Sequence, residues 1–284
     1  MSPRLRKSAL RYNRVFSGEH RHNSRYYHLS VKTYGRARGQ SAVATSSYRS
    51  GERLFDIRSG TWKDCRNGRG GILAKFILGW TGSREGLWNA AEFAETRWNS
   101  RFAREVEIAL PGGRSLEEWK ALAEEFAKWY VDRFRSAVDV AIHESAQGCV
   151  NPHAHILTTV RVVRDGRFLE KIRELDARNT GPKAIRETRT QWALVLNTFL
   201  ERCGLEKVSE KSLKAQGIKR QPTIHEGPRF SINYALNHEK NERIRQEEAR
   251  RAAEKAKEAE RQQKLRIRQE ELERDADRET DMER

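Results

Sequence analysis

The stretch AIHESAQGCVNPHAHILTT, residues 141–159, holds three of the chain's eight histidines within thirteen positions. Side chains of a β-strand repeat every two residues, so His153 and His155 point to one face of their strand. If the segments VDVAIHES and HAHILTT form a hairpin, His143 comes to lie beside that pair. The spacing therefore predicts two antiparallel strands that carry three imidazoles on one face.

Three neutral imidazoles can hold a divalent ion and still leave coordination positions open, which is typical of catalytic rather than closed structural metal sites. The plain alternative is a set of exposed or hydrogen-bonded strand histidines without an ion. We predict that His143, His153 and His155 are metal ligands.

A period-two alternation predicts another strand in REVEIALP (104–111), with Val106 and Ile108 on one face and Glu105 and Glu107 on the other. Carboxylates on a buried strand need a cation, a donor or water, although a solvated sheet face would also explain them. We predict that both flank the metal site. One of them could orient a ligand, bind the ion or take a proton, and Glu105 is the favoured candidate.

Flanking segments supply a further strand and two helices. The segment 25–34 alternates as a half-buried strand. After it, Ser41 can cap a helix over SAVATSSYRSGERLF (41–55), whose small residues allow close packing and which contains Tyr48. The segment 115–134 opens with a capping box of Ser115 and Glu118.

Charge divides the 284-residue chain, which carries a formal net charge of +16. Residues 238–284 hold 14 basic and 15 acidic side chains and predict one long solvated helix or a disordered tail. The remaining 42 basic and 25 acidic side chains belong to the body. A basic body indicates a polyanionic partner such as nucleic acid. We expect a basic extension over 1–25, a catalytic domain over 26–237 and a tail over 238–284.

Several protein classes do not fit. No run of about twenty apolar residues occurs and the start lacks a secretion signal, so membrane insertion is not expected. Three scattered cysteines form neither a disulfide framework nor a zinc ribbon. We expect a cytoplasmic protein. A divalent ion beside a basic body suggests phosphate chemistry, with water, a serine or a tyrosine each possible as nucleophile.

Several blocks, in order, resemble the MobA/MobL family of plasmid relaxases, which are conjugation nickases of the HUH type. The blocks span about 26–228 and are YHLSVKTYGRARGQSAVATSSYRSGERL, REVEIALP, VDVAIHESAQGCVNPHAHILTT and EKSLKAQGIKRQPTIHEGP. The resemblance implies an α+β fold: a five-stranded antiparallel sheet of the HUH and replication-initiator type with helices packed on one face, here followed by the charged C-terminal helix.

The resemblance also implies an activity. Such enzymes cut one strand of a transfer origin by attack of a tyrosine hydroxyl, remain joined to the 5′ phosphate and release a 3′ hydroxyl. By block position Tyr48 matches the nucleophile, His143, His153 and His155 match the ligands of Mg²⁺ or Mn²⁺, and Glu105 matches a carboxylate of that site.

The implied partners are single-stranded transfer-origin DNA, accessory relaxosome proteins and the coupling protein of a secretion system. The implied location is the bacterial cytoplasm, from which the protein could accompany DNA into a recipient. The last block could be a loop that closes the domain, whereas the resemblance implies that it contacts DNA or covers the site. Its candidate DNA-binding residues are Lys214, Lys219, Arg220 and His225. Two alternatives stay open: a rolling-circle replication initiator with the same chemistry, and a non-catalytic DNA-binding protein.

Overall fold

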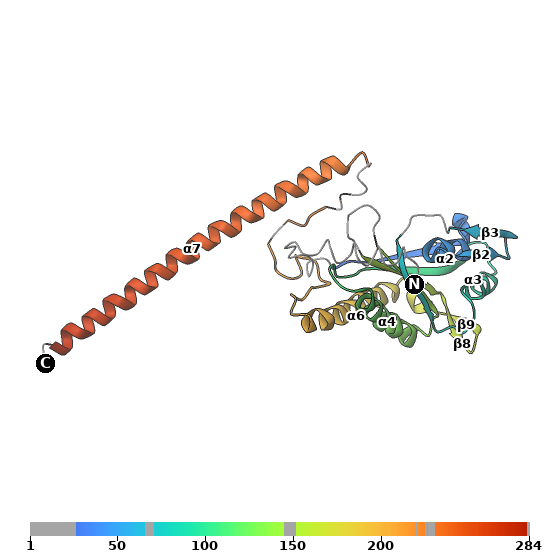
Figure 1. The fold of residues 1–284 in the computed structure, drawn as a ribbon, viewed down its shortest axis with the longest axis horizontal. Helices are drawn as coiled ribbons and strands as arrows, with labels where there is room; N and C mark the ends of the chain where they lie inside the picture. Colours follow the sequence, from blue (N-terminus) through green and yellow to red (C-terminus); the bar gives the residue numbers. More distant parts are fainter. Residues whose placement is uncertain are drawn as a thin grey trace, which may run out of the picture. The chain divides into compact units, whose positions relative to one another are not determined.

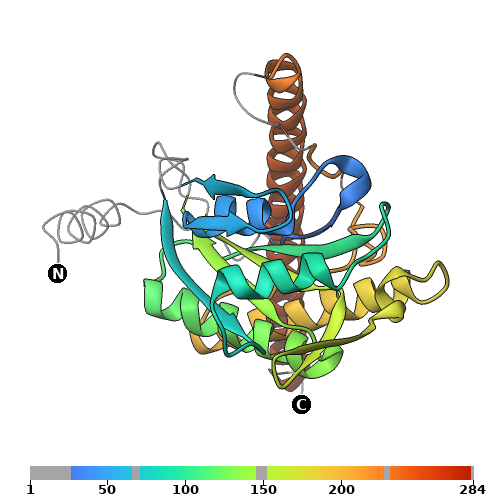
Figure 2. The same cartoon turned by 90° about the vertical axis from the view of Figure 1, so that its right-hand side faces the viewer.

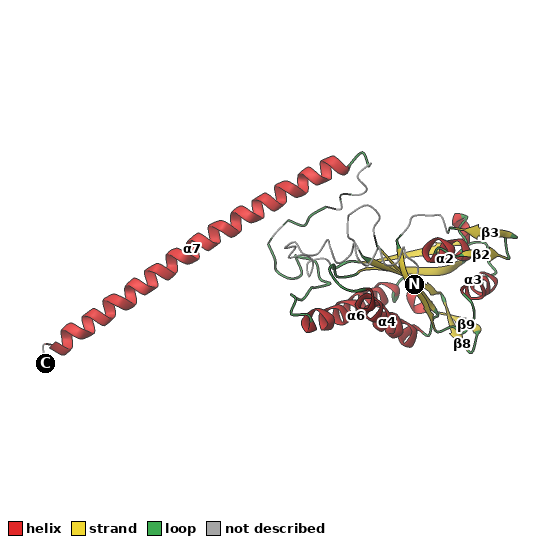
Figure 3. Ribbon diagram, in the orientation of Figure 1, coloured by secondary structure: helices red, strands yellow, loops and turns green. Residues whose placement is uncertain are grey.

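The computed structural model describes residues 27–65, 71–144, 152–219, 221–224, 226 and 231–282. These residues form interleaved strands and helices (Figure 3). The chain divides into two compact units, Met1–Glu210 and Lys211–Arg284. In chain order the elements are β1 (Leu29–Gly35), η1 (Arg36–Arg38), α2 (Ala42–Ser50), β2 (Arg53–Asp56), β3 (Thr61–Asp64), β4 (Ile72–Leu78), α3 (Arg84–Phe93), β5 (Arg101–Ala109), α4 (Leu116–Phe134), β6 (Val138–His143), β7 (His153–Thr159), β8 (Arg161–Arg164), β9 (Arg167–Lys171), α5 (Arg173–Asp176), α6 (Gly181–Arg202) and α7 (Tyr234–Met282).

The first unit is built on a five-stranded sheet in the order β1-β5-β7-β6-β4. Each strand is antiparallel to its neighbours. The predicted α+β fold with a five-stranded antiparallel sheet is confirmed. The predicted hairpin of the two histidine-bearing strands is β6–β7, at the centre of the sheet.

Helices α4 and α6 cover one face of this sheet (Figure 1). Val106, Ile108 and Ile156 point to that face, where they pack with Trp119 and Trp192 of the helices. The predicted capping box begins α4, because the Ser115 and Glu118 side chains each accept a backbone N–H. The alternating apolar residues of the strands therefore form the main core, as the sequence predicted.

The face of the sheet opposite α4 and α6 carries a second helical layer. Helix α2 lies over it, on the other side of the sheet from α4 and α6 (Figure 2), and α3 packs beside α2. Ala42 and Val43 of α2 pack with Trp88 of α3 and Leu157 of β7 in a smaller core. Small residues let α2 approach the strands closely, as expected from its sequence.

Helix α2 ends earlier than predicted. The sequence suggested a helix over 41–55, whereas the helix ends at Ser50 and residues 53–56 form β2. Gly51 has a φ of 62°, and this left-handed conformation stops the helix. The next residues can then pair with β3 as a hairpin. Tyr48 therefore lies in the last turn of α2.

The second unit is dominated by α7, the predicted charged helix. Asn241, which is buried, donates to the backbone oxygen of Ile224 and accepts from its N–H, at 2.8 Å each. The segment before the helix is thus fastened to its first turns, and residues on both sides of the predicted 237/238 boundary are in contact. The division of the chain into functional domains stays a prediction.

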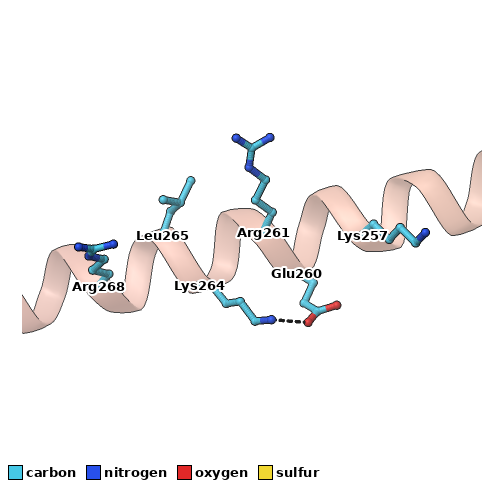
Figure 4. Close-up of a pocket in the computed structure, with 6 residues that line it drawn as sticks. All are labelled: Lys257, Glu260, Arg261, Lys264, Leu265 and Arg268. Carbon is cyan, nitrogen blue, oxygen red and sulfur yellow. Dashed lines mark ion pairs between the residues drawn. The ribbon is translucent and has the colours of Figure 1, made fainter.

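Ion pairs between side chains three or four residues apart run along the rest of α7. One shallow hollow is lined by charged side chains and Leu265, all from this one helix, with Lys264 paired to Glu260 at 2.7 Å (Figure 4). Exposed pairs of this kind contribute only about 0.3–0.5 kcal/mol each. Among the described residues, no helix combines the length and the apolar character needed to cross a membrane.

Candidate active site

Three histidines meet on the sheet face that α2 covers in part. His143 lies opposite His153, and Ala141 lies opposite His155, so the register of β6 and β7 sets all three rings side by side. Ring centroids are 4.8–5.6 Å apart. One ring nitrogen from each lies within 4.8 Å of the others. The predicted convergence is confirmed, and metal binding by these residues stays a prediction.

The surroundings of two of these rings suit a divalent ion. Nε2 of His143 lies 2.7 Å from the carbonyl oxygen of Arg49, which can only accept, so Nδ1 of this ring keeps its lone pair. Nδ1 of His155 lies 2.9 Å from Oε1 of Glu105, which favours a proton on Nδ1 and leaves Nε2 available. Metal-binding histidines typically direct their other nitrogen to a carbonyl or carboxylate in this way.

The protonation state of His143 is also the one that metal binding requires. Burial of the ring lowers the pKa of His143 to about 4, against the raising effect of its contact with the Arg49 carbonyl. The ring is therefore neutral at pH 7, which is the form that binds metal.

Glu105 is the most enclosed carboxylate of the site. Its side chain is fully buried and accepts from Arg49 Nε at 2.5 Å and from the Tyr34 hydroxyl at 2.7 Å. Burial by itself raises the pKa of Glu105, but the contacts with His155 and Arg49 outweigh it and hold that pKa well below its usual range. A carboxylate this acidic is a weak proton acceptor. It is better suited to orient His155 and to balance positive charge.

Glu107 lies at the edge of the cluster and is partly exposed. Its Oε2 accepts from Lys32 Nζ at 2.8 Å and lies 3.8 Å from Nδ1 of His155. Burial raises the pKa of Glu107, yet the bond from Lys32 brings it below the usual value. Both glutamates therefore flank the histidines, as the strand alternation predicted.

Tyr48 stands in the last turn of α2 with 45% of its surface exposed. The guanidinium of Arg49 lies over its ring, 5.1 Å from the centroid. The same Arg49 touches His143 with its carbonyl and Glu105 with its side chain. Tyr48 is thus the chain neighbour of a residue that contacts two members of the cluster.

Arg49 was not singled out from the sequence. It directly follows Tyr48 in TSSYRSGE, but no local pattern distinguishes it from a solvated arginine. Its importance comes from two contacts with residues 56 and 94 positions away.

A buried network fastens α2 to the sheet. Asp139 of β6 accepts from Ser46 Oγ at 2.7 Å, from Trp88 Nε1 at 2.8 Å and from Arg84 Nε at 2.9 Å. Arg84 also donates to Glu52 just beyond α2, at 2.6 Å. Three elements, α2, α3 and β6, therefore share one buried carboxylate, and this arrangement fixes the helix that carries Tyr48.

We expect Asp139→Asn to lower the free energy of unfolding by about 3 kcal/mol, because it removes the buried one of the two carboxylates that pair with the Arg84 guanidinium and leaves Glu52 as the other. Urea unfolding measures the change. Asp132→Asn, an exposed position on α4, is the matched control and should change stability by less than about 0.5 kcal/mol. Equal stabilities of the two variants would contradict the assigned role of Asp139.

The predicted DNA-binding residues follow the first unit in the sequence. Lys214 and Lys219 are exposed and belong to the second unit, Lys211–Arg284. Arg220 and His225 lie outside the described residues. A role for these four residues in DNA binding stays a prediction.

Comparison with known proteins identifies the family of the chain. The model of the MobA/MobL family matches residues 40–240, a range that includes Tyr48, Glu105 and the three histidines. Mobilization protein MobL of Acidithiobacillus ferridurans is 32% identical over 234 residues, covering 71% of this chain and 62% of that protein. Mobilization protein A of Escherichia coli is 34% identical over 219 residues, covering 71% of this chain and 29% of that protein. The chain thus spans less than two thirds of the length of these relatives.

A solved structure is similar as well. It is described as "Molecular Basis of Vancomycin Resistance Transfer in Staphylococcus aureus" and has a TM-score of 0.57 and 32% sequence identity. The match covers 66% of this chain and 98% of the solved chain.

Proposed function

This chain belongs to the MobA/MobL family, and from that premise we propose that it is a conjugative relaxase, a site- and strand-specific DNA endonuclease that nicks one strand of a transfer origin and so initiates plasmid mobilisation. The observation that carries the proposal is the cluster of His143, His153 and His155, packed against the end of the helix that presents Tyr48. The mobilization names of the relatives support it.

In the proposed reaction the Tyr48 hydroxyl attacks the scissile phosphorus. A bond forms between its oxygen and phosphorus while the bond from phosphorus to the 3′ oxygen breaks. The tyrosine proton ends on the released 3′ hydroxyl, and the DNA remains attached through a 5′-phosphotyrosine diester. Because one diester replaces another, the strand can be rejoined after transfer.

The three histidines would hold Mg²⁺ or Mn²⁺ at this place. Such an ion, when bound, polarises the phosphate and stabilises the charge on its oxygens. Glu105 would fix the orientation of His155 through the short contact with Nδ1, and Arg49 would hold Glu105 and His143 together. Glu107, paired with Lys32, would add negative charge near the cluster.

The proposed substrate is single-stranded transfer-origin DNA, bound with the help of the basic body. Accessory relaxosome proteins and a coupling protein would be further partners. Relatives named conjugal transfer protein TraA, from Rhizobium radiobacter among others, support a conjugative context.

Purified protein incubated with an oligonucleotide from the transfer origin and Mn²⁺ tests the proposal. We expect a single cut on one strand and, when the label is on the 3′ side of the nick, a protein–DNA adduct that survives denaturation. A cut at random positions, or on both strands, would contradict the assignment as a relaxase.

Of the two ions, Mn²⁺ should support nicking at about ten-fold lower concentration than Mg²⁺, because imidazole nitrogens suit transition metals whereas Mg²⁺ prefers oxygen ligands. A titration of initial nicking rate against each ion measures this. Equal half-maximal concentrations would show that oxygen ligands dominate the site.

A further inference from the structure

The β2–β3 hairpin presents an aromatic and cationic face to solvent. Phe55 lies opposite Trp62, and Arg53 lies opposite Asp64, so these four side chains share one face of the hairpin. Trp62 is 52% exposed, with the Arg53 guanidinium 4.2 Å from its ring centroid and the Phe55 ring 5.1 Å away. Leu54, on the other face, is buried in the core beneath α2. An exposed tryptophan held between neighbours in this way indicates a binding surface.

Hydrogen bonds to α3 hold the hairpin in place. Phe55 donates its backbone N–H to Glu85 at 2.6 Å and accepts from Asn89 at 2.8 Å, both on α3. Asn89 also accepts from the N–H of Ile57 at 2.9 Å. These backbone groups of Phe55 and Ile57 are therefore satisfied by α3, and the aromatic face is the surface offered to a partner.

The same hairpin is attached to the helix of the proposed nucleophile. Ser47 Oγ lies 3.0 Å from the backbone oxygen of Lys63 in β3 and 2.6 Å from that of Glu52. Since Ser47 directly precedes Tyr48, the hairpin is fixed relative to the last turn of α2. The two residues in this contact, Ser47 and Lys63, are the chain neighbours of Tyr48 and Trp62.

We propose that Trp62, with Arg53 stacked on its ring, is a platform on which one unpaired base of the bound DNA strand stacks. This proposal rests on the proposed function, because it takes single-stranded DNA as the ligand. Aromatic rings and guanidinium planes hold unpaired bases in this way, with little preference among the four bases.

Local charge favours stacking over phosphate binding at this hairpin. Arg58 is paired with Glu92 at 3.2 Å, and the Lys63 ammonium lies 3.8 Å from Asp56. The hairpin thus offers few unpaired cations to the backbone of the strand. Loss of the ring should weaken DNA binding at every ionic strength without changing the salt dependence.

The test uses the full-length protein and a fluorescent single-stranded oligonucleotide in EDTA, so that binding is measured without cleavage. Trp62→Ala should weaken binding about ten-fold, and Trp62→Phe should recover most of the loss. Trp98→Ala is the matched control, since Trp98 is 74% exposed on the segment between α3 and β5 and should have no effect. The slope of log Kd against log salt should be the same in all variants.

A scan with abasic nucleotides sharpens the result. One position should weaken binding to wild-type protein when its base is removed and make no difference to Trp62→Ala. Wild-type affinity in Trp62→Ala, with nicking intact, overturns the platform and leaves the proposed function standing. Failure of the wild-type protein to bind the oligonucleotide overturns both. A Trp62→Ala variant that binds DNA normally but dissociates from a dimer on sedimentation would assign the face to a second copy of the chain and overturn the platform.

Discussion

Tyr48→Phe should bind transfer-origin DNA and metal as well as the wild-type protein and form no covalent complex. The change removes one oxygen from a half-exposed side chain, so it costs little packing. Because that oxygen is the proposed nucleophile, the nicking rate should fall by a factor on the order of 10⁵. Origin DNA labelled on the 3′ side of the nick, separated under denaturing conditions, measures the adduct. Peptide mapping should place the nucleotide of the wild-type adduct on Tyr48.

Two other tyrosines are matched controls. Tyr34 lies on the same sheet face, but its hydroxyl donates to Glu105, and burial together with that carboxylate raises the pKa of Tyr34 to about 12. Tyr27 packs against the main core on the other face and donates to the backbone oxygen of Arg189. Neither hydroxyl is placed to attack as a phenolate, so Tyr34→Phe and Tyr27→Phe should keep the adduct. An adduct that persists in Tyr48→Phe and disappears in Tyr34→Phe would move the nucleophile to β1, and cutting without any adduct would point to water.

His153→Ala and His155→Ala should each reduce Mn²⁺ affinity by at least about 100-fold and nearly abolish nicking, while the fold and DNA binding persist. Each change removes one of the three imidazoles that the described residues bring together at the site. His155→Ala also removes one partner of the buried Glu105 carboxylate. The fold should persist, because Arg49 and Tyr34 continue to donate to that carboxylate. Calorimetric titration with Mn²⁺ and the nicking assay give the two readouts.

His28→Ala is the control for this pair. His28 is exposed and lies 3.9 Å from Glu107, outside the cluster of three. Its loss should change neither metal affinity nor nicking appreciably. Chelation by excess EDTA should stop the wild-type enzyme and added Mn²⁺ should restore it; undiminished activity in EDTA would rule out a metal-dependent reaction.

Four of the five strands of the main sheet, β1, β5, β6 and β7, and the positions of the histidines could be predicted because those signals are local. Alternation of apolar and polar residues in 104–111 assigns Val106 to the core and Glu105 to the opposite face, whatever the rest of the chain does. The capping box of Ser115 and Glu118 likewise depends on residues three positions apart. The His-x-His spacing places two rings on one face, and the short connection to the preceding strand brings the third beside them.

The length of α2 was not predicted. Gly51 is compatible both with a helix that continues and with a helix that ends there, and the pairing of β2 with β3 decides between the two. Arg49 and Asp139 were missed for a related reason. The bond from Arg49 to Glu105 joins residues 56 positions apart, and the bond from Ser46 to Asp139 joins residues 93 positions apart. No periodicity within one element encodes such a contact.

The sequence by itself determined which residues alternate on each strand, where α4 begins and which three histidines can share a face, since these follow from backbone geometry over a few residues. Only the tertiary structure decided which side chains surround them. It packed α2 against the histidine face, buried Glu105 between Arg49 and His155, and turned the hairpin after α2 so that Trp62 remains exposed. Those contacts depend on how separate elements pack, because the lower dielectric of a buried site strengthens the attraction within each ion pair and hydrogen bond.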